Sequence, residues 1–177
     1  MANIMFSSLP HKEQMKIVPK PPIEDVIREL FDDGDKKQVL LDFVVHLRKN
    51  KLNLLWALHN KWKATIKGKP IFYLGLNNNY WDIDLFLYNR NSYDDVIINE
   101  DLQYIFWDRI AYWPNPIHDC AGYKNKRCIS GKNITIYGKE FNNICECMSK
   151  FIRTPNNKTV KGIERLLDLE KQARMKI

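Results

Sequence analysis

Residues that can bind a metal lie in the last third of the chain. They are His118, Cys120, Cys128 and Cys145, with Cys147 two residues further on. Structural zinc takes four sulfur or nitrogen ligands, so this set has suitable chemistry and zinc is the cofactor it would take. The spacing is irregular and contains no Cys-x-x-Cys pair, and buried, unreactive cysteines are common. The sequence therefore leaves two alternatives: a zinc- or thiol-dependent module, or a set of structural thiols.

Two Gly-Lys pairs, at Gly131 and Gly138, resemble parts of a phosphate-binding loop. Such a loop needs four residues between its glycines and a Ser or Thr after the lysine, because that hydroxyl holds magnesium. Here six residues separate the glycines, and Glu140 follows the second lysine. We therefore exclude a phosphate loop. The alternating residues "NITIY" predict a short strand instead, with Ile134 and Ile136 turned inward.

Acidic residues and histidines elsewhere offer acid–base chemistry. Asp82 and Asp84 lie on one face of a predicted strand, about 7 Å apart, and could bind a cation. Alternating polar residues are also typical of a sheet with one solvated face, and we favour that interpretation. His46 and His59 can titrate near neutral pH, but no nucleophile has a recognisable catalytic context. We assign no catalytic residue and lean against an enzyme.

Aromatic residues are concentrated between positions 56 and 88. This group is larger than the core of a small sheet needs, so some rings should line the second face of the sheet. An aromatic face with a few polar groups is a usual small-molecule pocket, and we select Trp62, Tyr73 and Trp81 as candidate ligand contacts. The alternative is that helices cover these rings, which are then simply core. The members of the group are Trp56, Trp62, Phe72, Tyr73, Tyr80, Trp81, Phe86 and Tyr88.

The elements that position these residues follow from periodicity. Apolar spacing predicts helices over 23–31, 36–50, 99–113 and 157–176, with Asn99 as the N-cap of the third. Residues 54–88 predict an antiparallel meander with turns at "IKGKP" and "NNN". We therefore expect an α+β domain over 21–177, with N-terminal helices, an antiparallel sheet of three to five strands and further helices packed on one face. Residues 1–20 are expected to form a flexible arm.

Charge and hydropathy limit the functional class. The formal net charge is +7 and the sequence pI is near 9.2, which can attract nucleic acid. The lysines are spread along the chain and no nucleic-acid-binding motif is recognisable, so a basic nucleic-acid-associated protein is an alternative that we do not favour. No apolar run has the length of a membrane helix, and the first residues make a poor secretory signal. We expect a cytoplasmic protein with reduced cysteines and no membrane partner.

One segment carries a family resemblance. Gly131, Lys132, Thr135, Gly138, Lys139, Phe141, Asn143 and Cys145 form the pattern GK-x-x-T-x-x-GK-x-F-x-N-x-C. With the cysteine-bearing loop before it and "TPNNKTVKGIERLL" after it, this pattern resembles the C-terminal signature of an uncharacterised bacterial α+β protein family, a domain of unknown function. The resemblance covers roughly residues 25 to 170 and implies the fold, without an established activity. We expect a non-catalytic domain that binds a small molecule or a protein partner.

Overall fold

The computed structural model describes residues 21–32, 34–58, 60–111, 132–144 and 151–176. These residues form two compact units. The first unit comprises the described residues up to Asn89 together with those from Arg153 onward, and the second lies between Arg90 and Ile152. The arm predicted over residues 1–20 lies outside the described residues.

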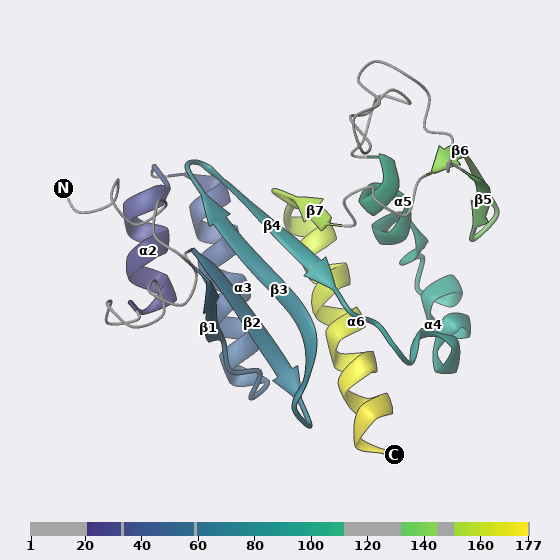
Figure 1. Cartoon of the computed structure of the whole chain (residues 1–177), viewed down its shortest axis with the longest axis horizontal. Coiled ribbons are helices and arrows are strands. Elements are labelled where there is room, and N and C mark those ends of the chain that lie inside the picture. The colour runs from purple at the N-terminus through teal and green to yellow at the C-terminus, as the bar shows by residue number, and fades with distance from the viewer. Residues whose placement is uncertain (1–20, 33, 59, 112–131, 145–150, 177) are drawn as a thin grey trace. The chain divides into compact units, whose positions relative to one another are not determined.

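The first unit is built around a sheet with the strand order β1-β2-β3-β4-β7. The pairs β1–β2, β2–β3 and β3–β4 are antiparallel, and α3 and α6 lie behind the sheet in Figure 1. The predicted α+β class, with an antiparallel sheet and helices on one face, is confirmed. The bounds are α2 Ile23–Leu30, α3 Asp35–Lys49, β1 Leu55–Leu58, β2 Lys61–Ile66, β3 Lys69–Asn77, β4 Tyr80–Leu85, β7 Phe151–Arg153 and α6 Asn157–Met175.

Local signals explain where these helices begin and end. Pro22 precedes α2, and proline is common at the start of a helix. Glu24 and Asp25 lie in the first turn, where the positive end of the helix dipole stabilises acidic side chains. The side chain of Asn156 caps α6 by accepting a hydrogen bond from the Thr159 backbone N–H at 2.9 Å. The predicted helices over 23–31, 36–50 and 157–176 are confirmed, and no end is shifted by more than one residue.

The core of this unit lies between the sheet and its helices. Phe43 of α3 stacks on Trp81 of β4, with ring centroids 5.8 Å apart, and also contacts Phe72 of β3 at 6.2 Å. All three side chains are fully buried. Each ring of this size removes a large apolar area from water, and burial of such a side chain contributes roughly 1.5–3 kcal/mol to folding. This packing fixes which face of the sheet the helices cover.

The second unit contains short helices and a separate hairpin. The bounds are a 3₁₀ turn at Arg90–Ser92, α4 Asp94–Asn99, α5 Gln103–Ala111, β5 Lys132–Ile136 and β6 Lys139–Ile144. The strands β5 and β6 are antiparallel, and the turn between them places Gly138 at a φ of 76°. The predicted strand at "NITIY" is confirmed, and Ile134 and Ile136 are both half-buried.

The helix predicted over 99–113 is present as α5 Gln103–Ala111, but its predicted start at Asn99 was wrong. Asn99 is the last residue of α4 and not the N-cap of the following helix. Asp101 has a left-handed φ of 53°, its N–H bonds to the Ile98 carbonyl, and the Leu102 N–H bonds to the Ile97 carbonyl. This is a Schellman motif, in which an aspartate takes the left-handed position that glycine usually occupies. The chain therefore ends α4 and starts α5 where apolar spacing alone continues.

Candidate functional site

The face of the sheet opposite α3 and α6 is the helix-free face, defined by Lys61, Lys63, Tyr73, Gly75, Asp82 and Asp84. Side chains alternate between the two faces of a strand. The neighbours of these six residues along the strands therefore point to the opposite face, and they are buried: Trp62, Ala64, Leu74, Trp81 and Ile83. No described helix of this unit lies over the helix-free face in Figure 1. Except for Gly75, which is buried, its side chains are half-buried.

The register of the strands gives this face an ordered charge pattern. Lys61 of β2 pairs with Gly75 of β3, which pairs with Asp82 of β4. The next row repeats the order with Lys63, Tyr73 and Asp84. Since neighbouring strands are about 4.8 Å apart, the basic and acidic strands of each row are separated by about 10 Å. Positive charge lies on one side, negative charge on the other, and an uncharged strand runs between them.

Gly75 leaves a notch in the middle of the first row. A Cβ atom at this position would lie 2.8 Å from Oδ1 of Asp82, which is closer than real Cβ contacts allow. The Asp82 carboxylate therefore lies over the backbone of β3, and a larger residue at position 75 would displace it. The notch brings a carboxylate to the centre of the face.

Asp82 is the electrostatically unusual group of this face. Burial raises the pKa of its carboxyl above the ordinary value, while Lys61 and Arg153 lower it and Asp84 raises it further. Among the described residues, no side chain or backbone N–H donates a hydrogen bond to it. A carboxylate that has lost part of its water without gaining a protein donor can accept a hydrogen bond from a ligand.

Aromatic rings and cations surround this carboxylate. The Lys61 ammonium lies 5.3 Å from the centre of the Tyr73 ring, and the Arg153 guanidinium lies 4.7 Å from that of Tyr80. Phe86 meets Tyr73 edge-on, with centroids 5.5 Å apart. Such contacts hold the cations against ring faces. The Tyr73 ring is thereby fixed beside the notch at Gly75.

The three predicted ligand contacts do not share a face. Tyr73 lies on the helix-free face, whereas Trp62 and Trp81 belong to the helix-covered face and are 3% and 0% exposed. Trp81 is core, as its stacking on Phe43 shows. Trp62 and Trp56 line a groove of about 880 Å³ at the β1 edge, together with Pro21 and Pro22. Only Tyr73 therefore contributes to the charged face.

The predicted metal ligands His118, Cys120, Cys128 and Cys145 lie outside the described residues. Within the described part of the chain, no three His, Cys, Asp or Glu side chains are grouped as a metal site requires. His46 contacts residues of the fold. Its Nδ1 lies 3.6 Å from Oε1 of Glu164 in α6, and its Nε2 lies 3.1 Å from the side-chain nitrogen of Asn50. His59 is outside the described residues.

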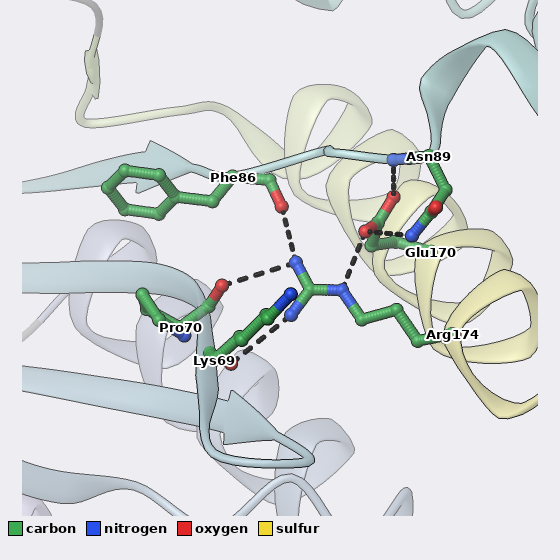
Figure 2. Close-up of polar contacts among 6 residues, drawn as sticks. All are labelled: Lys69, Pro70, Phe86, Asn89, Glu170 and Arg174. Carbon is green, nitrogen blue, oxygen red and sulfur yellow. Dashed lines mark hydrogen bonds and ion pairs between the residues drawn. The ribbon is translucent and has the colours of Figure 1, made fainter. Parts of the chain in front are cut away.

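Sequence reasoning missed a second polar cluster, at the end of α6. Figure 2 shows Arg174 surrounded by acceptors from three segments of the chain. Glu170 lies seven residues after Ile163 and three after Leu167, so helical spacing places it on the apolar stripe of α6. In the structure it is fully buried beside Arg174. An acid on an apolar stripe was the signal available in the sequence. Its partner Asn89, 81 residues away, could not be inferred.

Comparison with known proteins adds no assignment. No protein family model, curated protein or solved structure matches this chain. Among the described residues, no helix is long and apolar enough to cross a membrane.

Proposed function

We propose that this chain is a non-catalytic binding protein whose helix-free face holds a small zwitterion. The carboxylate of the ligand contacts Lys61 and Lys63, and its cationic group contacts Asp82. The observation that carries this proposal is the register that aligns Lys61, Gly75 and Asp82 in one row. A dipolar ligand lying across β3 matches the direction of the charge pattern.

The contacts explain why such a ligand would gain free energy on this face. An exposed ion pair contributes only about 0–1 kcal/mol, so the lysines alone give weak binding. Asp82 is different because burial has already removed part of its water and no described group donates to it. A hydrogen bond to a charged acceptor contributes roughly 1.5–3 kcal/mol. The ligand cation supplies the donor that Asp82 lacks.

The middle strand sets the shape of the ligand. Gly75 has no side chain, so the middle part of the ligand can approach the backbone of β3 beside the Tyr73 ring. Arg153 lies on the far side of Asp82 from Gly75, because β7 follows β4 in the sheet. A ligand cation therefore reaches Asp82 over β3, away from the Arg153 charge. A linear molecule with charges at its two ends fits this path.

Isothermal titration calorimetry with three matched ligands tests the proposal. L-arginine carries both charged ends, agmatine lacks the carboxylate, and L-citrulline lacks the charge on its distal group. We expect L-arginine to bind tightest and each analogue to lose roughly tenfold in affinity, in line with one charged hydrogen bond. Absence of arginine binding, or equal binding of all three ligands, would contradict the zwitterion proposal.

Variants of the chain locate the site. Asp82→Asn removes the charge without changing the shape, and Gly75→Ala displaces the carboxylate from the notch; both should weaken arginine binding by about tenfold or more. Asp42→Asn is the matched control, because Asp42 is an exposed aspartate of α3 that bonds only to Gln38 among the described residues. The control should bind arginine like the unchanged protein. An unaltered affinity in Asp82→Asn would place the ligand elsewhere.

A zinc- or thiol-dependent module is the second candidate function. Lys132 and Ile144 are cross-strand partners at the open end of the β5–β6 hairpin. In the sequence, Cys128 precedes Lys132 by four residues and Cys145 directly follows Ile144. This pairing of the nearest described residues supports a shared site for the two cysteines. Elemental analysis of reduced protein expressed with added zinc tests the metal site, and less than about a tenth of an equivalent of bound metal would exclude zinc binding.

A further inference from the structure

We propose that the cleft at the turn of the β2–β3 hairpin is a second binding site, for a phosphate group that carries a planar ring. The cleft encloses about 620 Å³ and is lined by Ile66, Lys67, Lys69, Tyr88, Asn89 and Arg174. This volume is within the range of small-molecule sites. A nucleoside monophosphate has the required chemistry, and none of the six residues that define the helix-free face lines this cleft.

The floor of the cleft is cross-linked by hydrogen bonds. Figure 2 shows that Arg174 donates from Nε to Glu170 Oε1 at 2.7 Å and from its two other nitrogens to the carbonyl oxygens of Lys69, Pro70 and Phe86 at 2.9–3.2 Å. Glu170 also accepts from the backbone and side-chain N–H groups of Asn89, both at 3.1 Å. The cleft walls from β3, from the segment that follows β4 and from α6 are thus joined before any ligand binds, which lowers the entropic cost of binding.

The charges that line the cleft favour an anion. The Arg174 and Glu170 charges compensate each other in a buried pair. Lys67 and Lys69 are exposed and form no ion pair with another described residue. The end of α6 contributes a partial negative charge of about one half, which is smaller than the two lysine charges. A guanidinium has five N–H donors, and the hydrogen bonds to described residues use four of them, so one remains for a phosphate oxygen.

Tyr88 supplies a surface for a ring. Its side chain is 65% exposed, although the Arg174 guanidinium lies 5.1 Å from its centroid and the Phe86 ring stacks on it at 6.2 Å with an interplanar angle of 25°. Two neighbours therefore hold the ring in place while much of its area is open. Aromatic side chains held in this way act as stacking platforms for bases. A phosphate near the lysines and a base on Tyr88 would fill the cleft together.

Calorimetric titration of the full chain with AMP, inorganic phosphate and adenosine tests this proposal. We expect AMP to bind at least about tenfold more tightly than either fragment, because only AMP has both recognised groups. Binding that is no tighter for AMP than for phosphate would overturn the ring contact. Failure of AMP to bind would overturn the site, as would a single-stranded oligonucleotide that binds far more tightly with steep salt dependence.

Variants separate the two halves of the cleft. Tyr88→Ala should weaken AMP binding about tenfold and leave phosphate binding unchanged, whereas Lys67→Gln/Lys69→Gln should weaken both. The control Lys36→Gln/Lys37→Gln removes the same amount of charge at the start of α3. Asp32, just before α3, bonds to Asn79 in the β3–β4 turn. The control therefore lies at the other end of the sheet from the cleft. Equal loss in the control would overturn the site. AMP binding should persist in Asp82→Asn, which distinguishes this cleft from the helix-free face.

Discussion

Glu170 at the end of α6 and Asp82 on the helix-free face are carboxylates of one unit with opposite surroundings. Glu170 is fully buried and accepts hydrogen bonds from the Arg174 side chain and from two N–H groups of Asn89. Asp82 is half-buried, with Lys61 and Arg153 acting on it only through space. The protein satisfies the first carboxylate internally and leaves the second without a described donor.

The difference separates a structural group from one that is available for binding. A buried charge is tolerated only when its partners replace water, and Glu170 meets that condition through segments far apart in the sequence. A carboxylate that is partly desolvated and unpaired reduces stability, so its position needs another reason. The ligand binding that we propose for Asp82 would be such a reason, and three changes to the chain test the contrast.

The largest effect is expected for Arg174→Met. The change leaves Glu170 buried without its cation, and three carbonyl oxygens lose the side chain that donates hydrogen bonds to them. The free energy of unfolding should therefore fall by about 3–5 kcal/mol. Urea denaturation measures it. Arg28→Met is the control, since Arg28 pairs with Asp25 and both side chains are largely exposed; it should cost at most about 1 kcal/mol. Similar losses in the two variants would contradict the structural role of Arg174.

A smaller effect is expected for Glu170→Gln. The glutamine keeps the shape, but its amide has one acceptor oxygen, and its NH₂ group would face donors from Asn89 or Arg174. The loss of a charged hydrogen bond should lower the free energy of unfolding by roughly 1.5–3 kcal/mol. The same denaturation assay checks it. The free energy of unfolding lost on Asn89→Ala should be smaller in the Glu170→Gln background than in the unchanged protein. Equal losses would show that the two residues are not coupled.

The smallest effect, and one of opposite sign, is expected for Asp82→Asn. Burial raises the pKa of Asp82 in the folded protein, so the folded state binds this proton more tightly than the unfolded state does. That stabilisation is complete below the unfolded pKa and is lost as the pH rises through the folded pKa. At pH 7 the ionised carboxylate therefore costs stability, and Asp82→Asn should be at least as stable as the unchanged protein. As the pH falls toward 4, the unchanged protein should gain stability relative to the variant. A variant less stable than the unchanged protein at pH 7 would contradict this prediction.

The sequence predicts the local elements of this contrast and none of its long-range parts. Apolar periodicity predicts α2, α3 and α6, and Lys67–Gly68 and Asn78–Asn79 predict the two turns of the meander, because these signals lie within a few neighbouring residues. The row formed by Lys61, Gly75 and Asp82 depends on two strand registers, which core packing on the other face determines. The contact between Glu170 and Asn89 is more distant still. The left-handed Asp101 shows the remaining failure, in which a backbone conformation overrides an unbroken apolar pattern.

The edge of the sheet also has an optical property. The Trp56 and Trp62 rings are cross-strand partners with centroids 5.0 Å apart and planes at 83°. Indoles this close couple their excited states, so the pair should give a circular dichroism band of its own in the far ultraviolet. Replacing either ring with phenylalanine should remove that band. The spectrum thus follows the attachment of β1 to β2 during unfolding, separately from the rest of the molecule.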